Sequence, residues 1–87
     1  MQYDFDPEKD TSNRTKHGLS LSEFPGFDFG TDLTIADERR DFGEPRYRSF
    51  GRINGLGYMI AFTLRGSRIR LISFRRAHEK ELQRYER

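Results

Sequence analysis

The sequence contains no cysteine, which excludes disulfide bonds, thiolate zinc sites and a cysteine nucleophile. No apolar run approaches the roughly 20 residues that are needed to span a bilayer. The N-terminus also lacks the basic end and the apolar centre of a signal peptide. These absences predict a cytoplasmic protein without membrane contact.

Apolar residues are scarce, at 33% of the 87 residues, whereas charged residues reach 34%. Eight Phe and four Tyr compensate for this shortage, because each aromatic ring buries a large area. The chain shows no internal repeat, linker or low-complexity tract. Its length therefore predicts one small domain that covers residues 1–87.

The formal net charge of +2 hides a strong asymmetry between the two halves of the chain. Residues 1–45 contain five Lys and Arg against eleven Asp and Glu, whereas residues 46–87 contain eleven against three. Ten of the eleven later cations are Arg, and the other is Lys80. Guanidinium groups bind phosphate or carboxylate through paired hydrogen bonds, so the basic half predicts a nucleic-acid or acidic-protein partner.

The N-terminal third carries two helix signals. Asp6 precedes a proline, as an N-cap precedes a first-turn proline, and Gly18 is a natural C-cap, so the pattern predicts a helix over Pro7–His17. Ser20 and Glu23 have the spacing of a capping box and predict a second, short helix.

The rest of the chain predicts strands followed by a last helix. Asn54-Gly55 marks a tight hairpin, and a polar turn over Asp37–Pro45 separates the first two strands. From Ala77 the apolar spacing is helical. The predicted fold is α+β, with two N-terminal helices, a three- to four-stranded antiparallel sheet and a C-terminal helix. The four predicted strands are Thr31–Ala36, Arg46–Ile53, Tyr58–Arg65 and Arg68–Arg75.

The last predicted strand alternates between two faces. Strict alternation places Ile69, Leu71 and Ser73 on one side. The other side then receives Arg68, Arg70, Ile72 and Phe74. Apolar residues on both sides predict one fully buried face and one that is only partly covered.

Three stretches resemble the BrnT family, the ribonuclease toxins of BrnT–BrnA type II toxin–antitoxin pairs. They are "YDFDPEKDTSNRTKHGLSLSEF", "FGRINGLGYMIAFTLRGSRIRLISFRRA" and "HEKELQRYE". The most specific piece is the spacing of Asp6, Lys9, Asn13, Lys16, His17 and Gly18. The resemblance implies a RelE-like microbial RNase fold, messenger RNA as substrate and neutralisation by a cognate BrnA-like ribbon-helix-helix antitoxin. It also implies that operator DNA is bound only through the antitoxin complex.

Arg52, Arg75 and Arg76 are the candidate catalytic cations. RNA cleavage by its own 2′-hydroxyl passes through a phosphorane with extra negative charge, which preorganised guanidinium groups stabilise. The predicted strand order brings together the strand ends that carry these three residues. Successive residues of a strand point to opposite faces, so only one of Arg75 and Arg76 can lie on a concave surface of the sheet. The alternative is that the arginines are solvated strand-end charges or partners of Glu79 and Glu81.

Candidates for positioning and proton transfer are His17, Glu79 and Tyr85. Histidine titrates near neutral pH, but a histidine before a C-cap glycine is also a common partner of the helix dipole. Tyr85 can stack a base or donate a proton, or it can pack on the sheet beside Leu82. No pair of histidines has the spacing of a pancreatic-type ribonuclease, which predicts slow turnover of naked RNA.

A second group of cations predicts general RNA contacts away from the reacting phosphate, with plain solvation as the alternative. The group comprises Arg65, Arg68, Arg70 and Lys80. The acidic residues near the N-terminus surround a capped helix start, which explains them without a metal ion. We therefore predict neither a metal site nor any other cofactor.

The sequence thus favours an endoribonuclease toxin that cleaves RNA without metal through arginine stabilisation. The alternative is a non-catalytic basic module that binds an acidic protein or nucleic acid.

Overall fold

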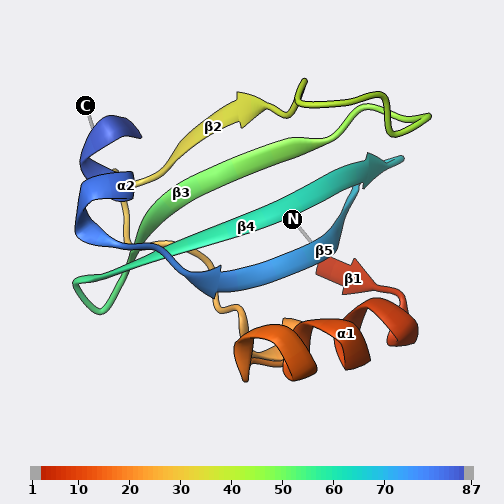
Figure 1. The fold of residues 1–87 in the computed structure, drawn as a ribbon, viewed down its shortest axis with the longest axis horizontal. Coiled ribbons are helices and arrows are strands. Elements are labelled where there is room, and N and C mark those ends of the chain that lie inside the picture. Colours follow the sequence, from red (N-terminus) through yellow and green to blue (C-terminus); the bar gives the residue numbers. More distant parts are fainter. Residues whose placement is uncertain (1–2, 86–87) are drawn as a thin grey trace.

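The computed structural model describes residues 3–85 as an α+β fold with a five-stranded mixed sheet and two α-helices (Figure 1). Within these residues, neither helix is long and apolar enough to cross a membrane. In chain order the elements are β1 (Tyr3–Phe5), α1 (Pro7–His17), β2 (Leu33–Ala36), β3 (Tyr47–Ile53), β4 (Leu56–Arg65), β5 (Arg68–Arg76) and α2 (Glu79–Tyr85).

The strand order in the sheet is β1-β5-β4-β3-β2. β2 to β5 pair antiparallel, as predicted, whereas β1 pairs parallel to β5 with Tyr3 opposite Ile69. The predicted three- to four-stranded antiparallel sheet is therefore wrong in its strand number and in one pairing direction. A three-residue strand that pairs with a segment at the other end of the chain leaves no local pattern in the sequence.

The first predicted helix is confirmed at both ends. Asp6 Oδ1 accepts a hydrogen bond from the Glu8 N–H at 3.1 Å, and Gly18 adopts a φ of 72°. The second predicted helix is only a 3-10 turn, Leu21–Glu23, although its capping box is formed. The proline that follows Phe24 explains this, because it holds Phe24 in extended backbone and stops the helix.

The predicted hairpin at Asn54-Gly55 is also confirmed. Both residues have positive φ values, 51° and 82°, as a tight turn between β3 and β4 requires. Ile53 then lies opposite Leu56, and this register brings the end of β3 beside the start of β4.

A β-bulge in β5 overturns the predicted alternation. Ser73 pairs with Ala61 and Leu71 pairs with Phe62, so Ile72 is the extra residue. Leu71 and Phe74 consequently lie in the same core, not on opposite faces as predicted. The bulge also decides the faces of the two arginines that follow, since it shifts each of them to the side opposite the one that strict alternation gives.

The two faces of the sheet carry separate cores. The first core lies under the 3-10 turn and consists of Leu21, Phe24, Ile60, Phe62, Leu71 and Phe74. The second core lies under α2 and consists of Phe50, Met59, Ala77 and Leu82. α2 approaches β4 closely because position 57 is glycine, where a Cβ would lie 2.9 Å from the Ala77 carbonyl oxygen. α2 covers only one end of its face, and we call the rest of that surface the open face.

Asn13 attaches α1 to the edge of β5 beyond the short β1. Its side-chain amide donates to the Phe74 carbonyl at 2.9 Å and its Oδ1 accepts from the Phe74 N–H at 2.9 Å. The same amide donates to the Leu19 carbonyl at 2.8 Å. Asn13 is buried, so it replaces a missing strand and pairs edge groups that water does not reach.

Candidate functional site

The end of the sheet beside α2 brings together the three predicted catalytic arginines. Arg52 lies opposite Gly57, and the neighbouring pair is Tyr58 with Arg76. The ends of β3 and β5 therefore meet at the start of β4, as the predicted strand order required.

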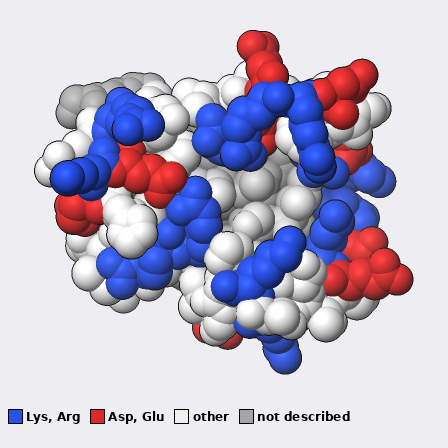
Figure 2. All heavy atoms as spheres, in the orientation of Figure 1, with Lys and Arg blue, Asp and Glu red and all other residues white. Residues whose placement is uncertain are grey.

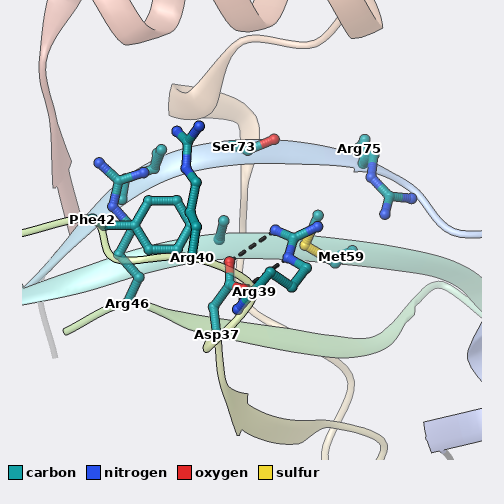
Figure 3. Close-up of a pocket in the computed structure, with 10 residues that line it drawn as sticks. Asp37, Arg39, Arg40, Phe42, Arg46, Met59, Ser73 and Arg75 are labelled. Atoms are coloured by element: carbon teal, nitrogen blue, oxygen red, sulfur yellow. Dashed lines mark hydrogen bonds and ion pairs between the residues drawn. The ribbon is translucent and has the colours of Figure 1, made fainter.

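Arg75 and Arg76 point to opposite faces of the sheet. The Arg76 guanidinium lies 5.2 Å from the centroid of the Tyr58 ring, which packs against the first core, and its Nε donates to the Gly57 carbonyl at 3.1 Å. Arg75 lies on the open face beside Met59 and Ser73 (Figure 3). Only Arg75 therefore reaches the concave surface, and the bulge in β5 selects it over Arg76.

Two carboxylates of α2 hold two of these arginines. Glu81 accepts paired hydrogen bonds from Arg75 at 2.9 and 3.0 Å, and Glu79 accepts from Arg52 at 3.0 and 3.3 Å. These hydrogen bonds lower the pKa of both glutamates, with the charge of the arginines adding to the effect. The predicted pairing of Arg75 with a glutamate of the last helix is confirmed by Glu81. Glu79, however, hydrogen-bonds to Arg52 and not to Arg76. The Arg76 Nε donates to a backbone carbonyl instead.

His17 ends α1 and is exposed. Partial burial of the ring lowers its pKa, and the positive charges of Arg75 and Lys16 lower it further. A lowered pKa favours the neutral imidazole, the form that accepts a proton.

Tyr85 packs on the sheet. Its ring stacks on Phe50 with 4.2 Å between the centroids and 15° between the planes. Phe50 is fully buried, so this stacking fixes the position of the Tyr85 ring.

The predicted RNA-binding cations do not form one group. Arg65 and Arg68 pair across the β4–β5 hairpin at the far end of the sheet. Arg65 binds Glu44 at 3.2 Å, while Arg70 lies 3.3 Å from Asp4. Arg68 lies 3.7 Å from the same Asp4 carboxylate, and Lys80 is exposed on α2.

A hollow on the open face gathers further arginines that the sequence interpretation missed. Figure 2 shows Lys and Arg side chains around a hollow whose floor is uncharged. One hollow on this face has a volume of about 490 Å³ and lies between the segment 37–46 and strands β4 and β5; we call it the loop hollow. It is lined by Asp37, Arg39, Arg40, Phe42, Arg46, Met59, Ala61, Ile72, Ser73 and Arg75.

The sequence predicts a plain polar turn over Asp37–Pro45, the larger part of this segment. Its signal was the run of arginines with an aromatic residue in "DERRDFGEPR", which is unusual for a solvated turn. Both Arg40 and Arg46 lie over the Phe42 ring, at 4.8 and 4.4 Å from its centroid (Figure 3). The segment therefore forms a wall of stacked guanidinium and aromatic groups.

Asp37 anchors this wall. It is buried, and its carboxylate accepts two hydrogen bonds from Arg39 at 2.7 and 2.8 Å. Its backbone N–H donates to the Arg46 carbonyl at 2.8 Å and closes the base of the segment. The hydrogen bonds from Arg39 lower the pKa of Asp37 to about 2, and the charge of Arg48 acts in the same direction.

The lowered pKa of Asp37 predicts acid sensitivity. The folded pKa lies below the ordinary 3.8, so this carboxylate stabilises the fold above pH 3.8 and loses that contribution as pH falls toward about 2. We expect the urea midpoint of the wild type to exceed that of Asp37→Asn above pH 3.8, and the difference to shrink below it. A difference that stays constant over this range would contradict the assignment.

The family model described as "Ribonuclease toxin, BrnT, of type II toxin-antitoxin system" matches residues 5–81. A search of curated proteins finds no match. The matched range includes both α1 and β5, and thus the residues that place His17 and Arg75.

Proposed function

Since this chain belongs to the BrnT family of ribonuclease toxins of type II toxin–antitoxin systems, we propose that it cleaves messenger RNA at the open face beside Arg75. The observation that carries the proposal is the placement of Arg75. Its guanidinium is held by Glu81 through paired hydrogen bonds and lines the loop hollow on the open face.

The proposed reaction is a transphosphorylation. The 2′-hydroxyl oxygen attacks the phosphorus while the bond from phosphorus to O5′ breaks, and the products carry a 2′,3′-cyclic phosphate and a free 5′-hydroxyl. One proton leaves the 2′-hydroxyl and one is added to O5′, so the atoms balance without a metal ion or a redox partner. The side chains need only move protons and stabilise the charge of the phosphorane.

Arg75 is proposed to stabilise the phosphorane. Glu81 fixes the plane of its guanidinium, which matters because preorganised donors do not need to reorient during the reaction. Arg52 and Arg76 lie at the same sheet end and are proposed to make weaker contacts to the RNA backbone. Glu79 positions Arg52 through its own paired hydrogen bonds.

His17 is proposed as the general base. Its lowered pKa keeps the ring neutral, and the nearby Arg75 attracts the phosphate whose 2′-hydroxyl must be deprotonated. Tyr85 is the candidate for proton delivery to O5′, because stacking on the buried Phe50 fixes the position of its ring beside the open face.

The role of His17 predicts a pH dependence. A base must be unprotonated, so kcat/KM should fall as pH drops through the His17 pKa, with a midpoint below the ordinary 6.5. Histidine titrates between about pH 5 and 8, so rates on a defined oligoribonucleotide are measured over that range. The wild type should show this fall in kcat/KM at low pH, and His17→Gln should not. An unchanged fall in the variant would exclude His17 as the base.

The family implies an antitoxin partner. We propose that this partner is a BrnA-like ribbon-helix-helix protein and that operator DNA is contacted only through the complex. The basic open face supports an electrostatic contribution to that binding, because four arginines line the loop hollow against one aspartate.

Induction of the chain in a bacterial host tests the proposed function. We expect growth arrest with the wild type and normal growth with an Arg75→Ala/Arg76→Ala variant that circular dichroism shows to be folded. If the folded, well-expressed wild type does not affect growth, the non-catalytic binding module becomes the better account.

A further inference from the structure

The loop hollow has the size and lining of a site for one nucleotide. Its volume of about 490 Å³ falls in the range of ligand pockets. Its floor is formed by Met59, Ala61 and Ile72, which offer an apolar surface. Four arginines and one carboxylate also line it. A ligand with a flat apolar face and a negative charge therefore fits the apolar floor and the basic rim.

The positive charge at the rim is only partly neutralised by the protein. Arg40 contacts Phe42 and has no carboxylate partner within residues 3–85. The Arg46 Nε lies 3.8 Å from Glu44, which is beyond hydrogen-bond length. In contrast, Arg39 and Arg75 are each bound by a carboxylate through paired hydrogen bonds. Arg40 and Arg46 are therefore the rim cations whose charge is least neutralised by carboxylates of the described residues.

The wall of the hollow is suited to a nucleobase. Phe42 lies between two cationic side chains, and planar guanidinium and phenyl groups both stack on the π-face of a base. An acidic peptide would use the arginines but has no flat group for this wall. The lining therefore favours single-stranded RNA over an acidic protein segment.

The hollow is also continuous with the proposed reaction site. Arg75 lines it at one side, and Arg46 and Ile72 also line a smaller hollow toward Arg70. From Arg75 to Arg70 the open face of β5 covers about 17 Å at about 3.3 Å per residue. An RNA strand along β5 would thus place a flanking nucleotide in the hollow while its neighbouring phosphate lies at Arg75.

We propose that the loop hollow binds the nucleotide next to the scissile phosphate, with its base on the wall of Arg40, Phe42 and Arg46 and its own phosphate at Arg40 and Arg46. The inference rests on the proposed function in that the same strand is cleaved at Arg75. It adds a base-binding subsite built by the segment 37–46, and it assigns stacking of the flanking base to the wall around Phe42.

Binding of uncleavable RNA tests this subsite directly. A 2′-O-methyl oligonucleotide is titrated against the wild type, Phe42→Ala, Arg40→Gln and the control Arg14→Gln, which removes one charge from the exposed side of α1. The same titrations use oligonucleotides with a single abasic position. We expect one abasic position to weaken binding to the wild type about tenfold. Phe42→Ala should bind the intact and the abasic oligonucleotide with nearly equal affinity, because the base and the ring form one contact.

Arg40→Gln should weaken binding more than Arg14→Gln at low salt. Equal losses in these two variants, or an abasic effect that is the same in the wild type and in Phe42→Ala, would overturn the subsite. If Arg40→Gln leaves RNA affinity unchanged but weakens the antitoxin complex, the subsite proposal is wrong and the loop hollow binds the antitoxin. A wild type that shows the expected base coupling but never cleaves unmodified RNA would instead refute the proposed function alone.

Discussion

Replacing Arg75 with alanine is expected to lower kcat for RNA cleavage by about 100- to 1,000-fold, because loss of one preorganised transition-state donor has an effect of that order. The same assay should show a much smaller loss for Arg76→Ala, since Arg76 lies over Tyr58 on the opposite face of the sheet. These neighbours carry the same side chain and reach opposite faces of the sheet, so each serves as the other's control.

Two further variants sharpen this comparison. Arg75→Lys keeps the charge but cannot form the paired hydrogen bonds to Glu81, so its rate should lie between those of the wild type and Arg75→Ala. Arg14→Ala removes a charge on α1 and should leave the rate unchanged. Equal losses in Arg75→Ala and Arg76→Ala, with both proteins folded, would contradict the placement of the reacting phosphate on the open face.

Replacing Asn13 with alanine is expected to lower the free energy of unfolding by roughly 2–4 kcal/mol, because buried backbone groups lose their partners. The variant leaves the Phe74 N–H and carbonyl and the Leu19 carbonyl without the amide that pairs them. A domain of this size has a total stability of roughly 4–13 kcal/mol, so the loss is large.

Urea unfolding and amide exchange check the role of Asn13. The Phe74 amide should be protected in the wild type and exchange faster in Asn13→Ala. Thr15→Ala on the exposed side of α1 is the matched control, and its stability should change by less than about 0.5 kcal/mol. Unchanged protection of Phe74 in Asn13→Ala would show that α1 is held to β5 by other contacts.

Local signals in the sequence predicted the elements that depend on local chemistry. Caps at Asp6 and Gly18 defined α1, and the Asn54-Gly55 turn defined the hairpin that brings Arg52 to the end of β5. The grouping of Arg52 with the end of β5 followed from strand order alone, which is why it could be predicted without coordinates.

The features that the sequence did not predict depend on contacts between distant segments. β1 pairs with β5 across nearly the whole chain, and the bulge at Ile72 depends on its pairing with β4. Strict alternation therefore assigned Phe74 to the face opposite Leu71, which is wrong, and it left open which of Arg75 and Arg76 reaches the concave surface. The segment 37–45 looked like a plain turn because its position over the open face involves residues of β4 and β5, which line the loop hollow together with it.

The most direct test of the central claim is the chemistry of the product ends. Purified wild-type protein is incubated with a defined oligoribonucleotide in excess EDTA, and the fragments are analysed by mass spectrometry. The account predicts cleavage with a 2′,3′-cyclic phosphate on one fragment and a 5′-hydroxyl on the other, and no cleavage at a position blocked by a 2′-O-methyl group. Fragments with 5′-phosphate ends, or cleavage that requires a divalent metal ion, would contradict it.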